Sequence, residues 1–288
     1  MNHINCNETL FQIEDLMLDV CLDRYYWRDA IVELEKIRET AIRIYDAELE
    51  YSPLIQGYFD LMSISHLSDS HQPDSDRVNP RRSPLQSRTA FQHFCDGLMD
   101  EHDHFILKHK RQRKRNFTAI KNHIEDLLDD GHELLLMLEG VSYPYTTAQD
   151  IYQFHENLKK FHRRVLNRDT CFKELLDYSW VIEQDRDEGY LCQFLFIYDG
   201  SYRNHTEKYV EEIIQILDDI EEENDSLNRE SKHQHRDSYE QDTLKSDMIH
   251  CNDVQIEENN LNIISILANF DIEDQYLRAR VKGMRCFG

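Results

Sequence analysis

Apolar residues recur at helical spacing over the first part of the chain. Ile13, Leu16, Met17 and Val20 lie on one helical face, and a second face runs from Trp27 to Ile44. Pro53 is suited to the first turn of a third, shorter helix. The pattern predicts an all-helical N-terminal region over residues 1–66.

The next segment, residues 67–88, contains three prolines and few large apolar side chains. Such a composition cannot bury enough surface to offset the entropy of ordering, so we interpret it as a flexible linker. Residues 89–116 follow as a helix over Ala90–Leu107 that leads into a basic stretch.

After residue 117 the pattern alternates between helix and strand. The apolar run at 132–143 predicts a buried strand, and the segments 175–183 and 190–198 predict a hairpin. Helices are expected after Thr147, at 205–218 and at 259–270, with an acidic insert at about 219–245 and a strand at 247–251. This order predicts an α+β domain over 117–288, a small antiparallel sheet with helices on one face in the ferredoxin-like manner.

Composition excludes several classes of protein. No apolar run approaches the length of a membrane helix, and the N-terminus shows no basic leader or apolar core, so we expect no membrane partner and no signal peptide. The seven cysteines are odd in number and never form a C-x-x-C pair. This argues against a disulfide framework or a zinc ribbon and indicates a cytoplasmic protein with reduced thiols.

The chain has 33 basic and 56 acidic residues, which give a net charge of −23. This charge argues against the binding of nucleic acid unless the basic residues gather at one place. They do gather in one run, which predicts a phosphate-binding stretch although such runs are often only solvated linkers. The run consists of Lys108, Lys110, Arg111, Arg113, Lys114 and Arg115. Near the C-terminus, the residues that could extend the same surface are Arg278, Lys282 and Arg285.

Two motifs carry a resemblance to a known family. The hairpin contains W-x-x-E at 180–183, Gly-Tyr at 189–190 and F-L-F-x-Y-D-G-S at 194–201, and the closing run is DQYLRARVKGMRCFG. These residues resemble the inoviral replication-protein family, also known as the YagK/YfjJ C-terminal domain. The likeness covers about Phe117–Gly288.

The resemblance implies a replication initiator of the HUH type. In such enzymes a strand carries His-hydrophobic-His, which holds Mg²⁺ or Mn²⁺, and a later tyrosine attacks the scissile phosphate. The matching strand positions here are Leu191 and Gln193, neither of which can replace imidazole as a ligand. The position that matches the tyrosine is Ile266. We therefore expect a degenerate site without nicking activity, and a need for a metal cofactor only if residual nuclease activity exists.

Two residues are weak catalytic candidates that also have ordinary structural interpretations. Tyr276 could be a displaced nucleophile or a packing residue, and Glu183 could be a metal ligand or a charge at the end of the hairpin. Strand alternation places Cys192 on the face opposite Leu191 and Gln193, where a buried thiol is expected.

The sequence therefore predicts a replication-initiator-like protein derived from a phage or another mobile element, such as a prophage. It would act in DNA binding or regulation, with single-stranded or origin DNA as its partner. The alternative is an acidic helical adaptor with no nucleic-acid role, in which the N-terminal helices bind a protein partner. The overall charge favours that alternative.

Overall fold

The computed structural model describes residues 5–63, 84–143, 148–187, 189–201, 206–225, 245–249 and 276–288. The three N-terminal helices are confirmed as α1 (Cys6–Cys21), α2 (Trp27–Ile44) and α3 (Pro53–Leu61). The Asn5 side chain caps α1 by accepting from the Glu8 amide, and Pro53 begins α3 as expected. One short strand, β1 (Leu49–Tyr51), interrupts the otherwise helical region.

A single long helix, α4 (Arg88–Asp129), follows the short 3-10 turn η2 (Pro84–Gln86). Its 42 residues span roughly 60 Å and include the whole basic run, so the expected helix end at Leu107 is wrong. Lys, Arg and Gln are good helix formers, and no Gly or Pro interrupts the run. Helix α4 passes residue 116 without a break, so the secondary structure marks no boundary between the two predicted segments that meet there. The division into domains stays a prediction.

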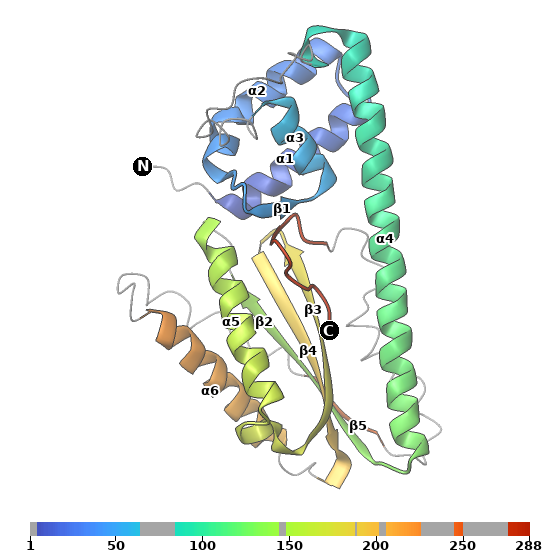
Figure 1. The fold of residues 1–288 in the computed structure, drawn as a ribbon, viewed down its shortest axis with the longest axis vertical. Coiled ribbons are helices and arrows are strands. Elements are labelled where there is room, and N and C mark those ends of the chain that lie inside the picture. Colours follow the sequence, from blue (N-terminus) through green and yellow to red (C-terminus); the bar gives the residue numbers. More distant parts are fainter. Residues whose placement is uncertain are drawn as a thin grey trace, which may run out of the picture.

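The second half forms the expected small antiparallel sheet (Figure 1). Its strands and helices alternate in the order β2 (Leu134–Tyr143), α5 (Ala148–Leu166), β3 (Leu175–Asp185), β4 (Gly189–Asp199), α6 (Thr206–Asp225) and β5 (Lys245–Ile249), with a 3-10 turn η3 (Thr170–Glu174) before β3. The spatial order is β3-β4-β2-β5, and every neighbouring pair is antiparallel. The hairpin is confirmed as β3 and β4.

The boundaries of two elements differ from those predicted from the sequence. Helix α6 continues through Asp225, so the first residues assigned to the acidic insert at 219–245 are helical. Strand β5 begins two residues before the expected segment at 247–251. The helix expected at 259–270, the position of Ile266 and most of the expected linker lie outside the described residues.

Each face of the sheet buries its own apolar cluster. On one face Phe194 and Phe196 pack among residues of α5 and α6, including Phe161 and Ile213. On the other face Leu134, Leu136, Leu195 and Ile197 pack against Ile120 and Ile124 of α4. The expectation of helices on one face is therefore incomplete, because α4 covers the second face.

The C-terminal segment joins the two halves of the molecule (Figure 1). Strand β6 (Ala279–Val281) pairs antiparallel with β1 of the N-terminal region. Residues 286–288 then run along the outer edge of β3, where the Trp180 amide donates to the Gly288 carbonyl at 2.8 Å and the Ile182 amide donates to Cys286 at 2.9 Å. The family-like C-terminal motif thus has a structural role, since it covers an edge strand that would otherwise expose unpaired backbone groups.

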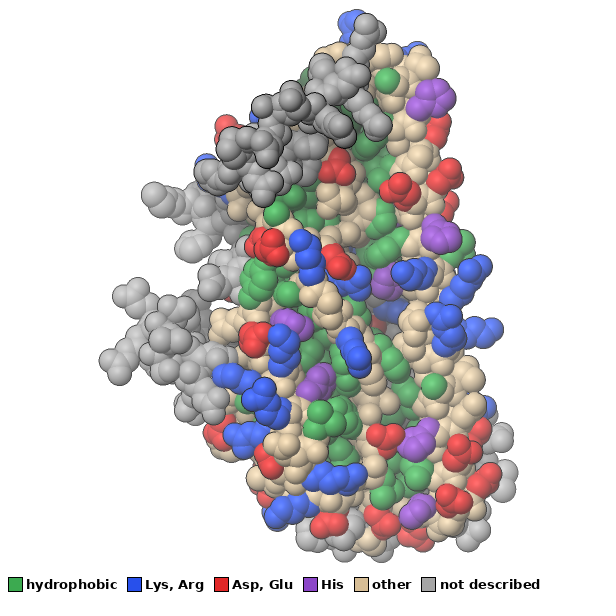
Figure 2. All heavy atoms as spheres, in the orientation of Figure 1, with side chains coloured by type: hydrophobic (Ala, Val, Ile, Leu, Met, Phe, Trp, Pro, Cys, Tyr) green, Lys and Arg blue, Asp and Glu red, His purple; other side chains and the backbone are tan. Residues whose placement is uncertain are grey.

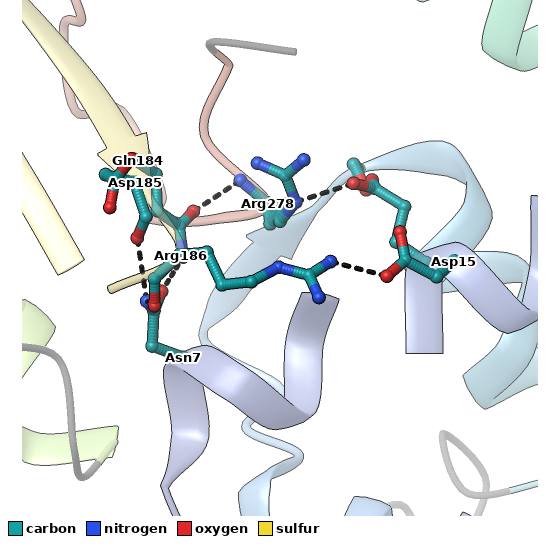
Figure 3. A network of polar contacts seen from close by, with 8 residues as sticks. Asn7, Asp15, Gln184, Asp185, Arg186 and Arg278 are labelled. Atoms are coloured by element: carbon teal, nitrogen blue, oxygen red, sulfur yellow. Dashed lines mark hydrogen bonds and ion pairs between the residues drawn. The ribbon is translucent and has the colours of Figure 1, made fainter. Parts of the chain in front are cut away.

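A buried polar network lies where α1 meets the hairpin and the C-terminal segment (Figure 3). Asn7 donates to the carbonyls of Asp185 at 2.7 Å and Arg186 at 2.6 Å, and it accepts from the Gln184 amide at 2.8 Å. Gln184 in turn accepts from the backbone N–H of Arg278 at 2.7 Å.

The charged centre of this network is the ion pair between Arg278 Nε and Glu14 Oε2, 2.6 Å apart. Glu14 also accepts from the Ser52 hydroxyl at 2.7 Å, and the Arg278 guanidinium lies 3.6 Å from the centroid of the Phe11 ring. Both charged side chains are almost fully buried. Each therefore depends on the other, because an unpaired buried charge is costly.

Two further properties agree with the composition. None of the helices in the described part of the chain combines the length and apolar character needed to cross a bilayer. The structure describes six of the cysteines, and five of them are buried.

Replacing Arg278 tests how strongly this junction stabilises the fold. The variant R278M leaves Glu14 buried without its cation, so we expect the free energy of unfolding to fall by about 3 kcal/mol or more. The control is R186A, which removes an exposed pair with Asp15 nearby and should cost about 1 kcal/mol or less. Urea denaturation measures both, and equal losses would contradict the role given to Arg278.

Candidate nucleic-acid interface

Leu191 and Gln193, which the resemblance described above would align with the two histidines, lie on the face of β4 that is turned toward α4. Leu195 and Ile197 continue the same alternation into the cluster under α4, whereas Cys192 belongs to the cluster on the other face. A methyl group of Leu191 lies 3.7 Å from the place a Cβ would take on Gly140, across the sheet. The expectation that Leu191 and Gln193 share one face of the strand, with Cys192 on the opposite face, is confirmed.

Glu183 lies on the same face as these two positions, because it is paired with Leu191 across the hairpin. Its carboxylate is 3.3 Å from a guanidinium nitrogen of Arg113, which reaches in from α4. Burial raises the pKa of Glu183 to about 7, while the neighbouring Arg113 lowers it. Burial also lowers the pKa of Arg113. Arg113 therefore provides the positive charge beside the one carboxylate that could have been a metal ligand.

Tyr276 packs against two aromatic side chains of α4 that lie one and two turns before Arg113. Tyr276 has its ring 5.2 Å from that of Phe105 and 6.1 Å from that of His109, and it is buried. Burial, with nearby Arg113, Arg280 and Lys108, lowers the pKa of His109 to about 4, so this imidazole is neutral near pH 7. This packing corresponds to the ordinary structural interpretation of Tyr276.

The residues present do not fit a catalytic metal. Among the described residues no group of three His, Cys, Asp or Glu side chains is placed to hold a metal ion. On the α4 face, the two positions that the resemblance would give to metal ligands carry an aliphatic side chain and an amide, and Arg113 is paired with Glu183. A guanidinium in that place opposes the binding of a cation.

A second buried carboxyl group, Glu139 of β2, does not complete this site. Burial raises its pKa to about 7. Its neighbour Met137 belongs to the cluster under α5 and α6, so by alternation Glu139 points to the face opposite Glu183. The two carboxyls therefore cannot act as an acid–base pair at one centre.

The basic run is divided by the helix that carries it. Arg113 points inward, whereas the remaining members lie exposed on the outer side of α4, namely Lys108, Lys110, Arg111, Lys114 and Arg115. The helix therefore presents a row of cations to solvent along its middle (Figure 2).

The three basic residues predicted near the C-terminus have different surroundings. Arg278 is buried and paired with Glu14, so a phosphate could reach it only if the network opened. Lys282 is exposed, donates to the Ala47 carbonyl at 2.7 Å and lies 3.9 Å from Glu48. Arg285 is exposed on the segment that runs beside β3.

Two features were missed from the sequence. The Arg113–Glu183 pair joins residues 70 positions apart, and no local pattern indicates it. The second feature, a basic half of α5, was visible as Lys159-Lys160-x-x-Arg163-Arg164 within the acidic half of the chain. Its signal was the local charge, which the net charge of the whole chain concealed.

Comparison of the chain with protein-family models, with curated proteins and with solved structures finds no match. The likeness to inoviral replication proteins therefore rests on the hairpin and C-terminal motifs alone.

Rebuilding the histidine pair tests the geometry of the strand face. The variant L191H/Q193H places two imidazoles beside Glu183, and adding R113A removes the competing cation. We expect Mn²⁺ binding by the double variant and binding about tenfold or more tighter by the triple variant, because the metal then takes the place of Arg113 as the positive charge beside Glu183.

Titration calorimetry measures these affinities, with Q193H/R113A as the control that carries one introduced imidazole. If the triple variant binds Mn²⁺ no more tightly than this control, the three positions do not converge as the structure indicates.

Proposed function

We propose that the chain is a cytoplasmic nucleic-acid-binding protein of phage or mobile-element origin, related to replication initiators and without metal-dependent nicking. The observation that carries the proposal is the row of exposed cations on the outer side of α4. The protein has a net charge of −23 and would repel a polyanion as a whole, but such a row of cations can bind a polyanion locally by neutralising its charges.

The arrangement of the sheet supports the proposed ancestry. The chain order β-α-β-β-α-β with the spatial order β3-β4-β2-β5 corresponds to the ferredoxin-like arrangement expected of an initiator domain. The positions matching the two histidines are neighbours on one strand face, as that chemistry requires. A shared fold does not establish activity, so the proposed function rests on the exposed cations of α4 and not on the topology of the sheet.

The loss of nicking follows from the same face of the sheet. In the proposed ancestor a cation bound beside this strand would polarise a phosphate. Here α4 packs over the face, and Arg113 is paired with Glu183. What remains is electrostatic binding of phosphates, which needs no metal and no nucleophile.

Removing three exposed cations of the run tests the proposal. We expect R111A/K114A/R115A to weaken binding of a labelled single-stranded oligonucleotide and to lower the salt slope of log K by about 2, since fewer counterions are released. Fluorescence anisotropy at several NaCl concentrations measures both quantities.

The matched control is K36A/R38A/R43A on α2, which removes the same charge from another helix. An unchanged slope in the α4 variant would exclude the run from the interface. If the wild-type protein does not bind the oligonucleotide at low salt, the proposal fails and the adaptor hypothesis is favoured.

A further inference from the structure

A second group of cations lies on α5, separate in sequence from the α4 run. The C-terminal half of α5 carries Lys159, Lys160, Arg163 and Arg164. Figure 2 shows Lys and Arg side chains over α5, over the middle of α4 and between them, on one face of the molecule.

The cations of α5 divide between two sides of the helix. His162 packs on β3, with its ring 4.6 Å from that of Trp180 and 6.0 Å from that of Tyr178. Lys159 precedes His162 by one turn, and Arg163 follows Lys159 by four residues, so these two cations lie on the β3 side of α5. Both are exposed, and Lys159 is paired with Glu156, 2.7 Å away.

The β3 side of α5, on which these two cations lie, also carries His162 packed on aromatic residues of β3. Tyr178 lies half-buried on the α5 side of β3. Burial lowers the pKa of His162 to about 4, so its ring is neutral and adds to an apolar, aromatic surface near pH 7. Cations beside half-exposed rings are the combination with which proteins bind single strands, phosphates on the cations and bases on the rings.

The C-terminal segment lies between this surface and α4. Residues 286–288 are hydrogen-bonded to the outer edge of β3, and Arg285 just before them is exposed. Lys and Arg side chains over the middle of α4 are seen on the same face of the molecule as those over α5 (Figure 2). The edge of β3, with residues 286–288 bonded to it, lies between the two helices (Figure 1).

Helix stabilisation alone does not account for all four cations of α5. Arg163 and Arg164 lie in the last turn, where positive charge interacts favourably with the helix dipole. This effect falls off within one turn, so it does not explain Lys159 and Lys160.

We propose that the β3 side of α5 is a second contact for single-stranded nucleic acid, with Lys159 and Arg163 binding phosphates and Tyr178 stacking on a base. The strand would cross from the exposed run of α4, past Arg285, to α5. This inference rests on the proposed function and adds to it the path of the ligand and a contact with bases.

The test uses the full chain and fluorescein-labelled oligothymidylate of about 20 nucleotides, with anisotropy measured against NaCl concentration. K159A/R163A should weaken binding about tenfold and lower the salt slope by about 1.4, the value for two single-strand phosphates. The matched control K36A/R43A on α2 should change neither quantity.

Tyr178 is tested by a pair of variants that differ in aromaticity. Y178L should weaken binding about fivefold or more with an unchanged salt slope, whereas Y178F should bind as the wild type does. A melting temperature close to that of the wild type shows that Y178L is folded. If it is not, the wild type is photocrosslinked to an oligonucleotide that carries 5-iodouracil, and absence of a cross-link at Tyr178 overturns the stacking contact.

The outcomes separate the two proposals. Loss of binding in the α4 variant but not in K159A/R163A overturns the second contact and leaves the proposed function standing. Absence of binding by the wild type overturns both. Equal affinity for a duplex of the same length, or for polyglutamate, overturns the assignment to single strands. Parallel measurements with oligouridylate show whether the protein prefers single-stranded RNA or single-stranded DNA.

Discussion

The ion pair between Arg278 and Glu14 is the interaction on which the rest of the architecture depends. It lies inside the protein, where each charge would be costly without the other. Through Gln184 and Asn7 the same network fixes the end of the hairpin against α1. The C-terminal segment that carries Arg278 then pairs with β1 on one side and with the edge of β3 on the other. Helices far apart in sequence are thereby held around one sheet.

This arrangement determines what the sheet can do chemically. Because α4 packs on the N-terminal helices as well as on the sheet, its middle is held over the strand face of Leu191 and Gln193. Arg113 takes the place beside Glu183 that a cationic metal would need. The inner side of α4 thus closes this face of the sheet, and its outer side turns the other basic residues to solvent.

Local patterns predicted the elements of this fold better than its contacts. The alternation in β4 was sufficient to place Leu191 and Gln193 on one face, because a strand has a period of two. The helices of the N-terminal region were evident from their spacing. The continuity of α4 was missed because a block of charge was interpreted as a break, although Lys and Arg favour helices. The pairs Arg113–Glu183 and Arg278–Glu14 could not be predicted, since each joins residues from distant parts of the chain. The Arg278–Glu14 pair buries Arg278, which the sequence had placed on an exposed basic surface.

The proposed function is the binding of single-stranded nucleic acid without metal chemistry. The most direct measurement compares binding of a labelled single-stranded DNA in Mn²⁺ and in EDTA, followed by denaturing electrophoresis of the same samples. We expect that Mn²⁺ does not strengthen binding and that no labelled band migrates with the denatured protein. A covalent protein–DNA adduct that forms only with Mn²⁺ would contradict it, because it would require both a bound metal and a working nucleophile.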